Sequence, residues 1–275
     1  MQLDELLASP AALPSIPKVV ALLMSELNRE EPDLRKVNQL INTDPGLTTR
    51  VLQLANSAFF QLSRRIGAVS EALAVLGLSH VRSLVSAAAL SGAFKVVPGI
   101  DMQQFWRYSL DVAKISRSLA GVVHENQGMA FTAGLIHAVG ELVMHTGMPA
   151  DMRDLDRAFS LLDLRRAKAE QRIFTFAYGE VGAGLARTWQ FPQQIVHALL
   201  YQHAPFDNDA YEPLAGVVHL SAWRARGREA GLDEKELAVS FPDVVGLALG
   251  LDIDGVLQQD PIDWSSNADA AHFAA

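Results

Sequence analysis

The amino-acid sequence predicts an all-α fold. Apolar residues recur at helical spacing along most of its 275 residues, and residues that cap helices stand where these segments begin. The one strand-like run, residues 173–178, is short and has no alternating partner, so we interpret it as a loop or the edge of a helix. Because 49% of the residues are apolar, the chain can bury a large core, and we expect a compact multi-helix body.

The first helices are predicted from acidic caps and a proline. Asp33 stands before an apolar stripe over residues 34–41, where its side chain can accept hydrogen bonds from the first free backbone N–H groups of a helix. Asp44 followed by Pro45 has the cap-then-proline order of a helix start, and apolar residues then recur at helical spacing through Ala55. We therefore expect two successive helices in this region.

Later helices follow from serine caps and from apolar periodicity. Ser70 can cap a short helix that Gly77 closes, and Ser79 can cap the next one. The remaining predicted helices are amphipathic or nearly all apolar; they cover residues 101–123, 134–143, 181–189 and 195–201. Proline, aspartate and asparagine cluster in residues 205–213, which indicates a connection to a smaller helical end. We expect the tail from Trp264 to be frayed.

The composition excludes or weakens several classes of protein. Without cysteine the chain has no disulfide, thiolate zinc site or cysteine nucleophile. Its formal charge of −8 argues against a broad nucleic-acid footprint. The most apolar stretch, residues 81–97, contains Arg82 and Lys95 and falls short of the ~20 apolar residues of a membrane span. The N-terminus lacks the basic start of a secretory signal. We expect a soluble, cytoplasmic protein that binds neither nucleic acid nor membrane.

A few polar residues in apolar surroundings are candidate functional residues. His137 and Glu141 lie four residues apart and could share a metal ion, but a core histidine bonded to a neighbouring group is the better supported interpretation. His203 follows His197 by six residues, which places them on separate helix faces. Asn56 follows a predicted helix, where it could satisfy backbone groups or serve a functional role.

An ordered set of motifs resembles one known family. The set consists of Leu13-Pro14-x-Ile16-Pro17, Asp44-Pro45-x-Leu47, Ala55-Asn56-Ser57-Ala58-Phe59, Ala72-x-x-x-Leu76-Gly77, Trp106, Gly134-Leu135-Ile136-His137, Glu180-Val181-Gly182-Ala183, Trp189 and Pro192. In this order and spacing it resembles the HDOD family, the HD-related output domain of bacterial signalling proteins. The family is a non-catalytic branch of the HD phosphohydrolase superfamily. The resemblance places an HDOD domain at residues 13–207 and a C-terminal helical extension at 208–275.

The resemblance implies a helical domain whose catalytic relatives hold divalent metal ions with histidine and aspartate ligands. In this chain several ligand positions carry other residues. Ala138 replaces the aspartate that follows the motif histidine His137, and Tyr178 stands where the family often has a histidine. Gln202 occupies the first place of a common histidine pair, which leaves His203 alone.

Two further departures reduce the implied ligand set. Tyr108 stands where catalytic relatives carry another histidine, and Glu141 replaces the usual lysine. What remains is a vestigial site of His137, Glu141 and His203, too few ligands to hold a metal ion firmly, so we expect no metal and no cofactor. Asn56 and Ser57 belong to the Ala-Asn-Ser-Ala-Phe motif of the resemblance and are candidate functional residues for that reason.

The expected function is therefore regulatory. We expect a non-catalytic bacterial signal-transduction module that binds another signalling protein or a small ligand. The alternative is a divergent metal-dependent HD-type phosphohydrolase acting on a nucleotide or cyclic dinucleotide. A helix–turn–helix over residues 34–55 is disfavoured, because Arg35, Lys36 and Arg50 are its few basic residues. The segment after residue 207 could be a partner interface or could pack against the main body; packing is the better supported of the two.

Overall fold

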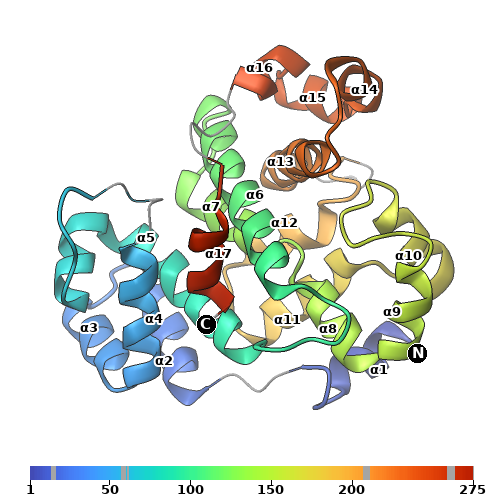
Figure 1. Cartoon of the computed structure of the whole chain (residues 1–275). Helices are drawn as coiled ribbons and strands as arrows, with labels where there is room; N and C mark the ends of the chain where they lie inside the picture. The colour runs from blue at the N-terminus through green and yellow to red at the C-terminus, as the bar shows by residue number, and fades with distance from the viewer. Residues whose placement is uncertain (14–16, 57–59, 61, 207–210, 259–263, 275) are drawn as a thin grey trace.

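The computed structural model describes residues 1–13, 17–56, 60, 62–206, 211–258 and 264–274. Every regular element within these residues is a helix, which confirms the all-α fold (Figure 1). The strand-like run at 173–178 covers the end of one helix, a turn and the start of the next.

The N-terminal helices are α1 (Leu3–Ala8), α2 (Lys18–Leu27), α3 (Leu34–Asn42), α4 (Pro45–Ala55) and α5 (Val69–Ala93). Their acidic caps lie where the sequence predicts them. The Asp33 side chain accepts hydrogen bonds from the backbone N–H groups of Arg35 and Lys36, and Asp44 accepts one from Leu47 at 3.0 Å. These bonds satisfy N–H groups that have no partner inside the helix, so α3 and α4 begin at the predicted residues.

Helix α5 joins the two helices that the sequence predicts around Gly77. It has 25 residues and bends at Gly77, whose φ of 77° and ψ of 168° are not helical. Ser70, a predicted cap, lies inside the first turn because α5 begins at Val69. Among the described residues α5 alone is long and apolar enough to cross a membrane, but 56% of its apolar window is buried in the protein. Such burial is typical of a core helix, and α5 packs against α4 and α7.

The central helices are α6 (Met102–Val122), α7 (Gln127–Ile136), α8 (Val139–Gly147), α9 (Pro149–Asp156), α10 (Arg166–Phe174), α11 (Tyr178–Thr188) and α12 (Gln193–Tyr201). The single helix predicted over residues 134–143 is wrong, since the chain breaks there at His137 and Ala138 into α7 and α8. Both halves are buried, so apolar periodicity gives no sign of the break. The break places His137 at a junction between helices.

Helices α8 and α11 touch through their backbones. A methyl group at Gly140 of α8 would overlap the carbonyl oxygen of Tyr178 and would lie 2.8 Å from the backbone nitrogen of Gly182, both on α11. Only glycine therefore fits at position 140 without a shift of one helix. The contact brings the first turns of α8 and α11 next to each other.

The C-terminal helices are α13 (Pro213–Glu229), α14 (Glu234–Ser240), α15 (Asp243–Leu249), α16 (Ile253–Gln258) and α17 (Asn267–Ala274). Helix α13 packs against α6, α7 and α12, and its buried face includes Leu214, Val217, Val218 and Leu220. This part of the chain packs back on the main body. Residue 207, the predicted domain boundary, lies outside the described residues, and the division of the chain there stays a prediction.

The expectation of a frayed tail is wrong for the described residues 264–274. Residues 267–274 form α17, which lies along α6 (Figure 1). The backbone N–H of Ser265 donates a hydrogen bond of 2.7 Å to the buried carboxylate of Asp111, and Arg107 donates one of 2.9 Å to the side chain of Asn267. These contacts with α6 hold a segment whose polar sequence suggests disorder.

Candidate functional site

Four residues at implied ligand positions lie around one buried cation, Arg226 of α13. The guanidinium carbon of Arg226 is 5.7 Å from the ring centre of Tyr108 and 5.6 Å from that of Tyr178. The Tyr108 ring lies 5.0 Å from the His137 ring, and the Tyr178 ring lies 4.5 Å from the His203 ring. Arg226 is thus flanked on two sides by a tyrosine backed by a histidine.

His137 is fully buried, and both of its ring nitrogens are engaged. Nδ1 donates a hydrogen bond of 2.7 Å to the carbonyl oxygen of Gly134, because a carbonyl can only accept. Nε2 then accepts a hydrogen bond of 2.9 Å from the hydroxyl of Tyr108. Burial, helped by the charge of Arg226, lowers the pKa of His137 to about 3, so the ring is neutral near pH 7. No nitrogen lone pair of His137 is left for another ligand.

Glu141 is held by a different cation, Arg166 of α10. The Arg166 guanidinium donates hydrogen bonds to both carboxylate oxygens of Glu141, from Nε to Oε1 at 2.7 Å and from Nη2 to Oε2 at 2.9 Å. Arg166 also bonds Asp156 at 2.8 Å and Glu170 at 3.1 Å. Burial and the neighbouring Glu141 raise the pKa of Glu170 well above its usual range, which favours its protonated form. Glu141 thus belongs to a buried ion-pair network.

Arg226 is the central residue that sequence reasoning missed. It is 6% exposed, and its Nη2 donates a hydrogen bond of 2.9 Å to the hydroxyl of Tyr178. Burial raises the pKa of Tyr108 and of Tyr178, so both phenols stay neutral and bond Arg226 without cancelling its charge. Within the described parts of the chain Arg226 has no ion pair, and its Nε has no hydrogen-bond partner.

Gln202 and His203 link the end of α12 to this cluster. The Gln202 side chain donates hydrogen bonds to the carbonyl oxygens of His137 at 2.9 Å and of Leu199 at 3.0 Å. The backbone carbonyl oxygen of Gln202 accepts a hydrogen bond of 2.6 Å from Nδ1 of His219 on α13. Burial lowers the pKa of His203 and of His219, so both rings are neutral near pH 7. Gln202, at the position of an implied metal ligand, therefore connects α12 to the α7–α8 junction at His137 and to α13 through hydrogen bonds.

The residues at this site do not fit a divalent metal ion. His137 has no free lone pair, Glu141 is neutralised by Arg166, and the cation Arg226 lies between the remaining positions. A second cation close to Arg226 would meet strong repulsion in a buried site. Across the residues that the structure describes, no three His, Asp or Glu side chains are grouped so that they could hold a metal ion.

Asn56, the other candidate, lies at the end of α4, far from this cluster along the chain. Its amide donates hydrogen bonds to the carbonyl oxygens of Leu52 at 2.7 Å and of Ile66 at 2.8 Å. Its side-chain oxygen accepts a bond of 2.7 Å from the backbone of Ile66. Asn56 thus closes the connection between α4 and α5. Ser57 lies outside the described residues.

A comparison of the sequence with models of protein families identifies the family of this chain. A model of the HDOD domain matches residues 13–205, well over half of the chain. The chain belongs to the HDOD family. Its all-helical fold is the one that the motifs imply, and the HDOD domain contains all the implied ligand positions but not Arg226. That residue comes from the segment that follows the matched domain.

The chain is also similar to a curated protein and to solved structures. An uncharacterized protein of Treponema pallidum (strain Nichols) is 24% identical over 211 residues, which span 75% of this chain and only 40% of that protein. A Shewanella amazonensis SB2B structure, named as a candidate phosphohydrolase, is 28% identical with a TM-score of 0.80 and covers 98% of this chain and 100% of its own. An HDOD domain protein of unknown function from Geobacter sulfurreducens is 26% identical with a TM-score of 0.72, covering 89% of this chain and 87% of its own.

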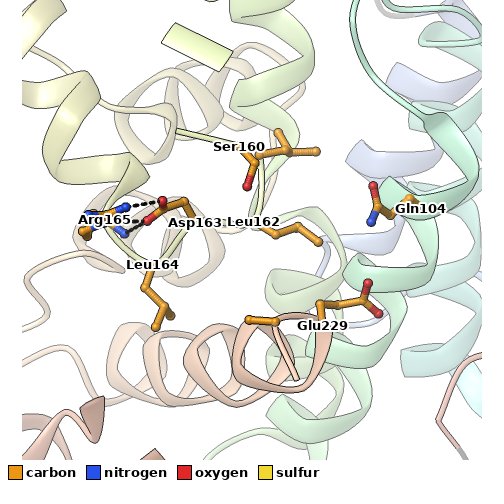
Figure 2. Close-up of a pocket in the computed structure, with 9 residues that line it drawn as sticks. Gln104, Ser160, Leu162, Asp163, Leu164, Arg165 and Glu229 are labelled. Atoms are coloured by element: carbon orange, nitrogen blue, oxygen red, sulfur yellow. Dashed lines mark hydrogen bonds and ion pairs between the residues drawn. The ribbon is translucent and has the colours of Figure 1, made fainter. Parts of the chain in front are cut away.

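Two pockets border the loop that precedes α10. Figure 2 shows the first, of about 530 Å³, in which residues 160–165 face Gln104 of α6 and Glu229 of α13. The second, of about 480 Å³, shares Leu164 and Arg165 with the first and reaches Arg226 and His203. The second pocket therefore borders the part of the cluster that Tyr178, His203 and Arg226 form.

Proposed function

We propose that this HDOD protein is a non-catalytic signal-transduction module that acts in the cytoplasm by binding another signalling protein or a small ligand. The observation that carries the proposal is the engagement of His137, the motif histidine, through both ring nitrogens. A hydrolase of this superfamily generates its hydroxide on a metal ion, and such a metal needs a lone pair from this histidine. In this chain the lone pair accepts a hydrogen bond from the hydroxyl of Tyr108.

The replaced ligands support the same proposal. Ala138 has no ligating atom, and the hydroxyl of Tyr178 accepts a hydrogen bond from Arg226. The amide of Gln202 is used on backbone carbonyls. Tyr178 and Gln202, the replacements that carry polar atoms, thus use those atoms in hydrogen bonds within the protein.

A metal analysis joined to activity assays tests the proposal. The purified protein would be analysed for transition metals and assayed for phosphodiesterase and phosphatase activity before and after addition of Mn²⁺. We expect no stoichiometric metal and no turnover above that of a His137→Ala variant. Stoichiometric metal, together with turnover that His137→Ala abolishes, would overturn the proposal.

The second candidate is a divergent HD-type phosphohydrolase acting on a nucleotide or cyclic dinucleotide. It is favoured by the Shewanella amazonensis structure, which is named as a candidate phosphohydrolase and is 28% identical. Nucleic-acid binding through α3 and α4 has less support. Lys36 is paired with Glu26 at 2.6 Å, and the chain carries a charge of −8.

A further inference from the structure

The pocket beside Arg226 has an unusual balance of charge. It lies between α10, α12 and α13, and its lining includes the cations Arg165, Lys168 and Arg226 together with His203 and His219. None of the residues that line it is aspartate or glutamate. In a chain whose net charge is −8, a pocket whose charged lining residues are all cations is a specific arrangement.

Two of these three cations have no anionic partner. Arg165 bonds both oxygens of Asp163, as the dashed lines of Figure 2 show. Lys168 and Arg226 form no ion pair with any described residue. Carboxylates that could reach Arg226 are already engaged with other cations, since Glu141 binds Arg166 and Glu229 binds Arg107. Among the described residues Lys168 and Arg226 therefore have no direct ion pair on this wall of the pocket, although the more distant charge of Glu141 favours the protonated guanidinium of Arg226.

A buried cation without a direct ion pair has lost the stabilisation of water, and an anion in the pocket would replace part of it. Burial removes water from a guanidinium that stays protonated at all ordinary pH values. The Nε–H of Arg226 is itself buried and has no acceptor among the described residues, so the hydrogen-bonding capacity of the guanidinium is not fully met within the chain. Lys168 is exposed at the pocket and can follow a ligand with its flexible side chain. Two unpaired cations match the double charge of a phosphate monoester.

The remaining wall of the pocket is apolar. Leu164, Ala222, Trp223 and Pro242 line it, and Trp223 is fixed by a hydrogen bond of 3.2 Å from Nε1 to Ser240. A volume of about 480 Å³ lies within the range of pockets that hold small organic ligands. The pocket thus offers a charged wall for an anionic group and an aromatic wall for an organic one.

We propose that this pocket binds a small organic phosphate of about the size of a nucleoside monophosphate, with its phosphate at Arg226 and Lys168 and its organic part against Trp223. The inference deepens the proposed function and rests on it, since the site would hold the phosphate without hydrolysing it. Arg226 belongs to the segment after the HDOD domain, so the ligand would join that segment to the domain.

Calorimetric titration of the full chain with AMP, inorganic phosphate and adenosine tests the inference. AMP is expected to bind at least about tenfold more tightly than adenosine, because adenosine lacks the phosphate. Lys168→Gln is expected to weaken AMP binding about fivefold, and Lys95→Gln, an exposed lysine outside the pocket, to leave it unchanged. Arg226→Gln is expected to weaken AMP binding more than Lys168→Gln does.

Three results would overturn the inference: no heat from AMP or phosphate up to about 10 mM, equal binding of adenosine and AMP, or equal effects of the Lys168 and Lys95 variants. Because Lys168 is exposed, its variant keeps the test valid even where the Arg226 variant does not fold. Release of phosphate from bound AMP would support a binding site for the phosphate but would refute the non-catalytic function. A failure of the proposed ligand site and a failure of the proposed function therefore give different results.

Discussion

The guanidinium of Arg226 donates a hydrogen bond of 2.9 Å to the hydroxyl of Tyr178, and this bond joins two parts of the chain that lie 48 residues apart. Tyr178 belongs to the HDOD domain, whereas Arg226 lies beyond residue 205, where the match to the family ends. A tyrosine in place of a family histidine therefore has a structural explanation. It provides a neutral oxygen for a cation that the following segment inserts into the site.

Removal of the C-terminal segment is expected to prevent folding. A chain that ends at residue 206 lacks α13, whose buried face covers α6, α7 and α12. It also leaves the hydroxyls of Tyr108 and Tyr178 without Arg226. We expect an insoluble or molten product by size-exclusion chromatography and near-ultraviolet circular dichroism, while removal of residues 264–275 alone leaves a folded protein. A soluble, cooperatively unfolding 1–206 chain would contradict this.

Tyr178→Phe is expected to destabilise the protein. The substitution removes the acceptor of a buried guanidinium N–H, and an unsatisfied charged donor costs about 2 kcal/mol. Tyr211→Phe is the matched control, since Tyr211 is 64% exposed and its hydroxyl makes one long bond of 3.3 Å. Urea denaturation measures both free energies of unfolding. Equal small losses in the two variants would show that the bond to Arg226 contributes little.

Arg166→Met is expected to cause a larger loss. It leaves the carboxylate of Glu141, which is 1% exposed, without its cation, and breaking a buried pair from one side costs about 3–5 kcal/mol. Arg157→Met removes the exposed pair with Asp154 and is expected to cost less than about 1 kcal/mol. Thermal and urea unfolding compare the two variants. A similar effect of both would mean that the Arg166 network is not a principal source of stability.

Asp111→Asn is expected to stabilise the protein at neutral pH. Burial raises the pKa of Asp111 from 3.8 to about 6. The folded state therefore binds this proton more tightly than the unfolded state, and its ionisation lowers stability as the pH rises from about 4 to about 6. The amide keeps an oxygen for the backbone N–H of Ser265 and carries no charge. The gain, on the order of 2 kcal/mol, is present above pH 6 and shrinks towards pH 4.

Melting temperatures of both proteins across this pH range test that expectation. Other titrating groups are common to the two proteins, so their contributions cancel in the difference. Asp4→Asn, an exposed aspartate, serves as the control and is expected to give a flat difference. A gain for Asp111→Asn that is the same at pH 4 and pH 8 would exclude ionisation of Asp111 as its cause.

The sequence predicts those parts of the fold that depend on neighbouring residues. The caps of α3 and α4 are local, because Asp33 and Asp44 bond backbone groups two or three residues ahead. The break at His137 is not predictable from periodicity, since the residues before and after it are equally apolar and buried. The motif histidine and its replaced partners are visible in the sequence, so the altered ligand set could be anticipated.

The centre of the site could not be anticipated in the same way. Arg226 stands near Arg224 and Arg228, and in sequence the three resemble an exposed basic stretch. Its burial follows from the packing of α13 on the HDOD domain, which is a contact between segments far apart in the chain. A local pattern of charges carries no information on such a contact.

Gly140→Ala is expected to destabilise strongly, because a methyl group there overlaps the carbonyl oxygen of Tyr178 and forces α8 away from α11. We expect a loss of about 3 kcal/mol or more. Gly67→Ala is the control, since a Cβ at Gly67 meets no atom within 4 Å. Denaturant unfolding separates the two, and a tolerated Gly140→Ala would show that the two helices can part at little cost.

The backbone contact at Gly140 also limits how this molecule can move. Because the backbones of α8 and α11 approach each other so closely at Gly140, sliding of one helix past the other would bring backbone atoms into overlap there, and we expect the two helices to move together. Helix α13, by contrast, meets its neighbours through side chains, which allow small shear displacements. Occupancy of the pocket would then be reported outward by a shift of α13 and the helices that follow it, measured against a fixed α8–α11 frame.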